Sequence, residues 1–353
     1  MNESHLSRWK VTHCCDAARA TLLRDDTRRD FVKTAFLGAA QVAGIPLLAG
    51  KAVAQSARNF PPPPPAVSPI QELMDTHVHS APDAFGRSLD DDEAAQLYKE
   101  KGVAAMVLKN HVVPTADRAW FLRKHVAGIQ VFGGIVLNAA VGGINPDAVQ
   151  WLCRMQGGYG RFVWFPTIDS DHHVKHFKDA PEGIKVLGDD GKVLPAVYEV
   201  LKVCAQQKLV VNTGHLSAAE AMAIIAAARD VGADRIIVTH AQFEVVNMSL
   251  DEMKKAAAMG AKLELCAVGP LMGPEAHLPW MRAWRQVKIQ ESIQAIHEVG
   301  AQHFVLATDL GQTGNPTHAD GLQMFVSELL AQGITKDQIK LMGRETTGAL
   351  LMG

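Results

Sequence analysis

From residue 70 onward, short apolar segments alternate with longer helix-like segments at a regular spacing. Several helix-like segments end in a glycine directly before the next apolar segment, and glycine commonly follows a helix C-terminus. Such alternation predicts parallel strands joined by crossover helices. The predicted strands are 72–76, 103–108, 131–137, 161–166, 209–212, 235–238, 262–265 and 304–307. Eight strands, each followed by a helix, fit a (β/α)8 TIM barrel.

The predicted helices are 90–101, 116–125, 195–207, 217–231, 249–259, 284–299 and 316–331, with a C-terminal helix over 335–352. An open doubly wound sheet is the competing architecture, but no glycine-rich dinucleotide or phosphate loop follows the first predicted strand. The connection 168–194, after the fourth strand, is long. Within it, 183–187 and 191–194 flank a turn at 188–190, which predicts a β-hairpin insertion near the site-facing end of the barrel.

The composition narrows the class of protein. Hydrophobic residues make up 48% and charged residues 20% of 353 residues, which excludes a disordered chain. The 35 Lys and Arg residues are offset by 37 Asp and Glu residues, so the chain is not a basic nucleic-acid binder. Five cysteines in a chain of this length do not form a disulfide framework.

The N-terminal region has the pattern of a removable export signal. Arg28 and Arg29 precede an apolar run of small residues, 34–50, and a small-x-small sequence follows at 52–54. This order of charged, apolar and small-residue regions resembles a twin-arginine export signal of bacteria. An amphipathic or transmembrane helix is the alternative, but the run is short for a bilayer span and contains glycines and a proline.

We therefore expect residues 1–54 to be a twin-arginine signal peptide. Residues 55–69 would be a proline-rich linker, with the stiff polyproline run 61–65, and residues 70–353 the barrel domain. The mature protein would be periplasmic or secreted, exported already folded by the twin-arginine machinery. No transmembrane anchor would remain after cleavage.

Metal-ligand side chains follow the predicted strands. His77 and His79 end the first strand, where positions two apart point to the same side. His215 follows the fifth strand, His240 the sixth and Asp309 the eighth. Because the C-terminal ends of barrel strands converge on one mouth, we expect these side chains to meet. Imidazoles with a carboxylate and no cysteine suit zinc or a similar divalent ion.

This ordered set resembles the amidohydrolase superfamily of metal-dependent hydrolases, and the resemblance covers residues 70–333. It implies that His77, His79 and Asp309 bind the more buried ion. His215 and His240 would hold a second ion in a binuclear version, or His215 would join a single-ion site. One or two divalent ions, zinc in the first instance, are therefore expected.

The fourth strand departs from the family pattern. Many binuclear members carry a carboxylated lysine or a glutamate there, and 162–167 offers neither. Lys109, after the second strand, could supply a carboxylated bridge between ions, bind a substrate carboxylate or pair with a nearby acid. These three roles for Lys109, and with them the number of ions, stay open at this point.

The ligand set predicts hydrolysis of a small ester, lactone or amide by metal-activated water, with Asp309 as general base. The alternatives are a mononuclear decarboxylase or hydratase of the same barrel family, and a non-catalytic periplasmic binding protein. The partners would be a small-molecule substrate and the export machinery, with no nucleic acid, and the sequence allows a homo-oligomer.

Further polar residues are candidates for the site only because of their positions in the sequence near the predicted strand ends. The candidates for substrate binding are His111, Glu244 and Gln312. Glu244 and Glu264 could each support a ligand histidine through a hydrogen bond. The loop histidines His172, His173 and His176 could touch substrate, but a solvated loop is the favoured interpretation.

Overall fold

The structure is a computed structural model that describes residues 67–352. The predicted signal peptide and most of the predicted linker lie outside the described residues. Among the residues described, no helix is long and apolar enough to cross a membrane.

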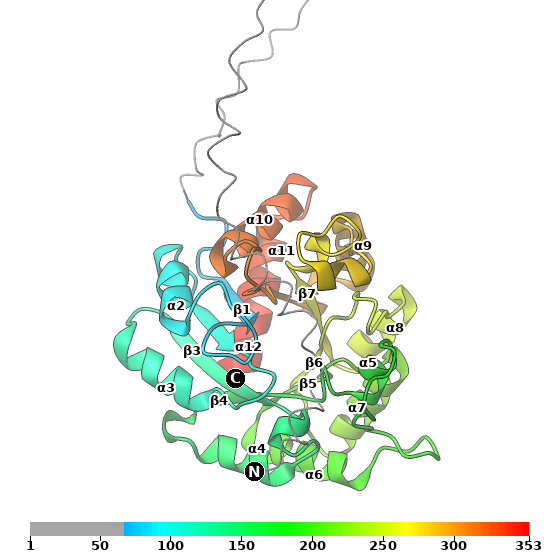
Figure 1. Ribbon diagram of the computed structural model, residues 1–353. Helices are drawn as coiled ribbons and strands as arrows, with labels where there is room; N and C mark the ends of the chain where they lie inside the picture. The colour runs from blue at the N-terminus through cyan, green and yellow to red at the C-terminus, as the bar shows by residue number, and fades with distance from the viewer. Residues whose placement is uncertain (1–66, 353) are drawn as a thin grey trace, which may run out of the picture. The chain divides into compact units, whose positions relative to one another are not determined.

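Eight parallel strands form the centre of the domain, each paired with the next along the chain (Figure 1). They are β1 (Met74–Val78), β2 (Ala105–Leu108), β3 (Gln130–Val136), β4 (Gly160–Trp164), β5 (Val210–Asn212), β6 (Ile236–Val238), β7 (Lys262–Cys266) and β8 (Phe304–Ala307). The ring closes just beyond β8, where the N–H of Asp309 donates to the carbonyl of His77 at 2.9 Å and the N–H of His79 donates to that of Leu310 at 3.1 Å. The predicted (β/α)8 barrel is confirmed.

Helices lie between successive strands and cover the outside of the barrel (Figure 1). They are α2 (Asp91–Glu100), α3 (Ala116–His125), α4 (Pro146–Arg154), α5 (Asp171–Val174), α6 (Pro195–Gln207), α7 (Ala218–Asp230), α8 (Leu250–Ala258), α9 (Ile289–Val299) and α10 (His318–Ala331). The C-terminal segment consists of α11 (Lys336–Lys340), a π-helical turn (Leu341–Thr346) and α12 (Thr347–Met352).

Two local predictions need correction, and one helix was not predicted. The predicted helix 284–299 begins only at Ile289, because the backbone is extended at Trp284 and at Lys288, after a separate 3-10 turn over Pro279–Ala283. Helix α4 was not predicted, although Asn145 caps it and Pro146 occupies its first turn. The predicted β-hairpin is reduced to one antiparallel bridge between Leu187 and Val193.

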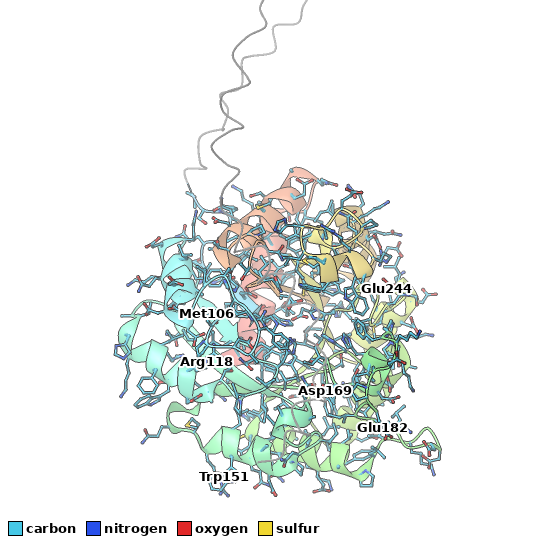
Figure 2. The ribbon with its side chains drawn as sticks, viewed as in Figure 1. Met106, Arg118, Trp151, Asp169, Glu182 and Glu244 are labelled. Atoms are coloured by element: carbon cyan, nitrogen blue, oxygen red, sulfur yellow. The ribbon has the colours of Figure 1, made fainter. Side chains whose placement is uncertain are left out.

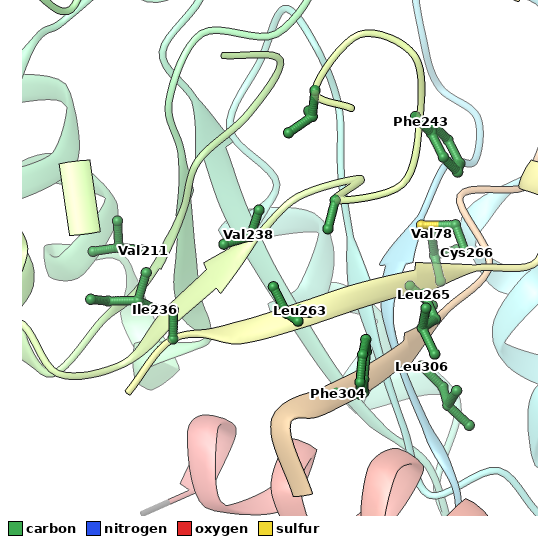
Figure 3. Packing of buried hydrophobic residues seen from close by; sticks show 14 of the residues in the cluster. Val78, Val211, Ile236, Val238, Phe243, Leu263, Leu265, Cys266, Phe304 and Leu306 are labelled. Carbon is green, nitrogen blue, oxygen red and sulfur yellow. The ribbon is translucent and has the colours of Figure 1, made fainter. Parts of the chain in front are cut away.

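Alternating strand residues divide the core into two layers. Leu263 and Leu265 of β7 pack with other outward-facing strand residues in the layer beneath the helices (Figure 3). A second cluster contains the intervening strand residues, such as Phe162 and Trp164 of β4, and includes Leu350 of α12. This second layer fills the barrel interior, since neighbouring residues of a strand face opposite sides. The position between Leu263 and Leu265 therefore faces the interior, and it is occupied by Glu264.

Candidate metal centre

Four of the predicted metal ligands converge at the C-terminal ends of the strands. The Oδ1 atom of Asp309 lies 3.0 Å from Nε2 of His77 and 3.2 Å from Nε2 of His79. Its Oδ2 atom lies 3.5 Å from Nε2 of His240. All four residues are buried. The expected convergence of strand ends is therefore found for β1, β6 and β8.

The backbone at two of these positions is unusual. His240 and Asp309, which follow β6 and β8, both have a φ of 52°, a region that non-glycine residues rarely adopt. Backbone hydrogen bonds hold them there: the N–H of His240 donates to Oε2 of Glu264 at 3.1 Å, and that of Asp309 to the carbonyl of His77. Such conformations persist where surrounding contacts fix them, commonly at functional sites.

Glu264 determines which nitrogen of two histidines carries the proton. Its Oε1 lies 3.0 Å from Nδ1 of His77, and its Oε2 lies 3.2 Å from Nδ1 of His240. An ionised carboxylate only accepts hydrogen bonds, so both Nδ1 atoms carry protons. Burial alone would raise the pKa of Glu264, but His77 and His240 hold it well below its usual range. The carboxylate is thus ionised, and the support predicted for Glu264 has a geometric basis.

The Nε2 atoms of these two rings then face Asp309. Burial and Lys109 lower the pKa of His77, but Asp309 and Glu264 outweigh them and raise it above its usual value, so an ion bound at Nε2 would replace a proton there. Although Nε2 of His77 lies 3.0 Å from the Asp309 carboxylate, it makes no hydrogen bond to any described residue. Burial would raise the pKa of Asp309, yet His77 and His240 hold it well below its usual range, so it is ionised too. Two imidazole nitrogens and an ionised carboxylate that face one another at this distance fit a cation between them, with Glu264 orienting the ligands.

His79 has a different hydrogen-bonding state. A terminal nitrogen of Arg87 lies 3.0 Å from Nδ1 of His79, and a guanidinium only donates. Neutral His79 therefore carries its proton on Nε2, directed at Asp309. Burial and then Arg87 hold the pKa of His79 well below its usual value. To bind an ion through Nε2, His79 must move this proton to Nδ1 and lose the Arg87 hydrogen bond.

Cys266 also lies at the site, which the sequence did not predict. Its Sγ lies 3.4 Å from Nδ1 of His240. Two groups of described residues bring ligand atoms close enough for an ion: His77 with His79 and Asp309, and His77 with His240, Glu264 and Cys266. Burial holds the pKa of the Cys266 thiol well above its usual value, which disfavours the thiolate that a metal needs. The first group, joined by His240, is the better match.

His215 borders this cluster and is not within it. Its ring centroid lies 5.3 Å from that of His240, and its Nδ1 lies 3.1 Å from Nδ1 of His173. His173, in α5, is buried and not a solvated loop residue. On the other side, the ring of His111 stacks on His79 at 4.9 Å, and its Nδ1 lies 3.0 Å from Oγ1 of Thr167. Ring contacts thus connect six histidines in succession: His173, His215, His240, His77, His79 and His111.

Lys109, at the end of β2, has an exposed fraction of 1%, and its Nζ has no hydrogen-bond partner within residues 67–352. The ring of Trp164 lies 5.8 Å from it. No carboxylate among the described side chains forms an ion pair with Lys109. The structure therefore gives no support to the interpretation of Lys109 as one half of a structural ion pair. Burial lowers the pKa of this amine, while Asp309 and Glu264 oppose that shift.

The remaining predicted site residues lie apart from the ligand atoms. Gln312 is buried, and its amide donates to the backbone carbonyl of Asp309 at 2.7 Å, so it braces the loop after β8. Glu244 is exposed and accepts the backbone N–H of Arg285 at 2.7 Å (Figure 2). A role in substrate binding stays a prediction for both residues.

A buried aspartate beneath the site escaped the sequence analysis. Asp75 accepts hydrogen bonds from the backbone N–H groups of His77 at 3.0 Å and Thr308 at 2.9 Å. The hydroxyls of Thr308 and Tyr98 donate to its other oxygen, each at 2.5 Å. Asp75 thereby ties β1 to β8 and holds His77 beside Asp309. Its side-chain partners, Tyr98 and Thr308, are distant in sequence, so no local signal could have revealed its role.

Comparison with known proteins provides a family. Residues 72–264 match DUF6282, a family of unknown function. This chain belongs to the DUF6282 family. No curated protein matches the chain.

Solved structures similar to this DUF6282 protein include an amidohydrolase, a probable dipeptidase and a decarboxylase. An amidohydrolase from Pseudomonas aeruginosa is 9% identical with a TM-score of 0.53, covering 80% of this chain and 96% of its own. The probable dipeptidase PvdM from the same organism is 11% identical with a TM-score of 0.57, covering 79% and 94%. A 2,6-dihydroxybenzoate decarboxylase bound to 2,6-dihydroxybenzoate is 14% identical with a TM-score of 0.50, covering 80% and 98%. At these identities the likeness establishes the fold alone.

Proposed function

We propose that this chain is a metal-dependent hydrolase of the amidohydrolase type that cleaves a small ester, lactone or amide. One observation carries the proposal: Glu264 holds protons on Nδ1 of His77 and His240, so that Nε2 of both rings faces Asp309. Nitrogen and carboxylate ligands suit zinc, with His79 as a further ligand once Arg87 releases it. His215 and His240 would contact a second ion if two are bound.

Residues of the chain itself would move the proton and orient the ligands. A bound divalent ion would supply a water of near-neutral pKa and polarise the scissile carbonyl. Asp309 is ionised, so one of its oxygens can accept the proton that this water loses and pass it to the leaving group. Glu264 keeps the two histidines in the tautomer that leaves Nε2 free.

A decarboxylase is the second candidate function, and Lys109 is the observation that favours it. A buried amine without a partner suits a substrate that carries a carboxylate, which both a decarboxylase and a hydrolase of acidic substrates would bind. Release of carbon dioxide from aromatic and unsaturated acids distinguishes the two reactions.

The experiment uses the purified full chain loaded with zinc and a panel of esters, lactones and amides. We expect turnover of at least one substrate, loss of turnover in His77→Ala, and normal turnover in the control His297→Ala, whose side chain is exposed on α9. Carbon dioxide release without hydrolysis would replace the hydrolase by the decarboxylase. Unchanged hydrolysis in His77→Ala would refute the metal site.

Export is a separate part of the proposal. We propose that residues 1–54 direct the folded chain through the twin-arginine route to the periplasm or the exterior, and that the mature barrel follows the linker 55–69. Fractionation of bacterial cells should find the wild-type chain outside the cytoplasm and shortened. Replacing Arg28 and Arg29 by lysine should keep it inside at full length, and export that is indifferent to this change would contradict the proposal.

A further inference from the structure

We propose that the substrate carries a carboxylate, held between Lys109 and Arg87 beside the His77–Asp309 cluster. This inference rests on the proposed hydrolase function and narrows its substrates to acids: esters, lactones or amides with a free carboxylate near the scissile bond.

Lys109 is the first support. Its side chain lies within the barrel mouth and is almost fully removed from solvent, yet none of the described residues accepts a hydrogen bond from its Nζ. Burying an ammonium without a partner raises the free energy of the folded chain. A cation–π contact with the Trp164 ring, at 5.8 Å from Nζ, offsets little of that increase. A ligand oxygen would supply the missing acceptor.

Arg87 is the second support. Its Nε and one terminal nitrogen each lie 2.8 Å from Oδ2 of Asp83, and the two side chains are 5% and 0% exposed. The loop that carries Arg87 is fastened to the loop after β8, because the N–H of Ser88 donates to the carbonyl of Gly311 at 2.8 Å and Arg87 bridges to Gln312. The guanidinium is therefore held beside His79 by Asp83 and by the contacts of its loop.

The two cations lie on either side of one pair of stacked rings. Arg87 contacts the ring of His79, and that ring stacks on the ring of His111, two residues beyond Lys109. The carboxylates nearby are already engaged: Glu264 and Asp309 face the ligand histidines, and Asp83 binds Arg87.

Arg87 is thus paired with Asp83, whereas Nζ of Lys109 has no acceptor among the described residues. A substrate carboxylate would supply that acceptor and would accept charge-assisted hydrogen bonds from both donors, with the planar guanidinium suited to a carboxylate. It would also take over the terminal nitrogen of Arg87 that now contacts His79, which frees His79 as a ligand. A neutral substrate would leave Lys109 unpaired.

The test measures binding without turnover. Calorimetric titrations of the full chain, with zinc and after removal of metal by a chelator, compare benzoate with benzamide, which has the same shape and no charge. We expect benzoate to bind at least ~10-fold more tightly than benzamide in both forms, the effect of about one charge-assisted hydrogen bond. Lys109→Met should remove this preference, and Lys109→Arg should restore part of it.

Lys262→Met is the matched control. Lys262 is partly buried at the opposite end of the barrel, at the start of β7, and donates to the carbonyl of Gln302. The preference for benzoate should survive this change. Lys109→Met should also raise Tm, because it removes a buried and unpaired charge.

Two results would overturn the inference. The first is an equal preference for benzoate in wild type and Lys109→Met. The second is that Lys109→Met lowers the number of bound ions and leaves benzoate affinity unchanged, which would make Lys109 a carboxylated metal bridge. Lys109-dependent benzoate binding without any hydrolysis would refute the proposed function alone, while hydrolysis without Lys109-dependent binding would refute this inference alone.

Discussion

Replacing Glu264 by glutamine tests how the site is built. Glu264 accepts three hydrogen bonds, from Nδ1 of His77 and from Nδ1 and the backbone N–H of His240. Glutamine has the same shape but one oxygen. If this oxygen stays with His240, the amide group faces Nδ1 of His77, and two donors cannot bond to each other. His77 must then move its proton to Nε2 and lose the lone pair that faces Asp309.

The expected magnitude follows from this loss. Removing a carboxylate that orients a ligand histidine lowers metal affinity by roughly 10–100-fold, which is about 1.4–2.7 kcal/mol. The loss of one charge-assisted hydrogen bond, about 1.5–3 kcal/mol, gives the same range. Zinc affinity is measured by competition with a chromophoric chelator at fixed pH.

Glu252→Gln is the matched control. Glu252 accepts the N–H and hydroxyl of Ser249 at the start of α8, and glutamine serves equally well in such a cap. Its zinc affinity should equal that of wild type. An unchanged zinc affinity in Glu264→Gln would refute the assignment of Glu264 as the residue that fixes the two tautomers.

Three further predictions follow. Asp309→Asn should lower turnover at least ~100-fold, with zinc content measured in parallel; unchanged turnover would remove Asp309 as the base. Burial holds the pKa of His318 at about 4, so between pH 6.5 and 4 the unfolded chain takes up a proton that the folded chain does not, and stability should fall by up to about 3 kcal/mol as pH drops through this window. Urea unfolding at several pH values should show a shallower fall in His318→Gln; an equal fall would refute the assigned pKa. An added Cβ in Gly311→Ala would collide with the carbonyl oxygen of His79, so Tm and zinc affinity should fall together, whereas Gly333→Ala, which meets no atom, should lower Tm only slightly; equal effects would contradict this.

Much of the fold could be predicted because the spacing of apolar residues along the sequence indicates its strands and helices. The strand 304–307 and the helices 116–125 and 195–207 have the predicted bounds, since apolar runs and their glycine or proline boundaries are local signals. The hairpin prediction failed because turn residues between two apolar runs do not ensure pairing, and only one bridge forms there.

Part of the candidate site could likewise be predicted from the sequence, and part could not. His77, His240 and Asp309 could be placed because each lies at or just beyond the C-terminal end of a strand, and barrel topology brings strand ends together. Arg87 and Asp75 could not, because their roles depend on contacts across the barrel mouth and its β1–β8 seam, to Gly311 and Thr308. His173 was underestimated because burial of a loop histidine depends on tertiary packing.

Metal content tests the central claim most directly. The full chain is loaded with zinc, passed through gel filtration and analysed by elemental mass spectrometry, beside a variant with His77→Ala and His240→Ala. We predict at least one ion per wild-type chain and almost none in the variant, since both Nε2 lone pairs are lost. A wild-type chain without metal, or a variant with full occupancy, would contradict the proposed site.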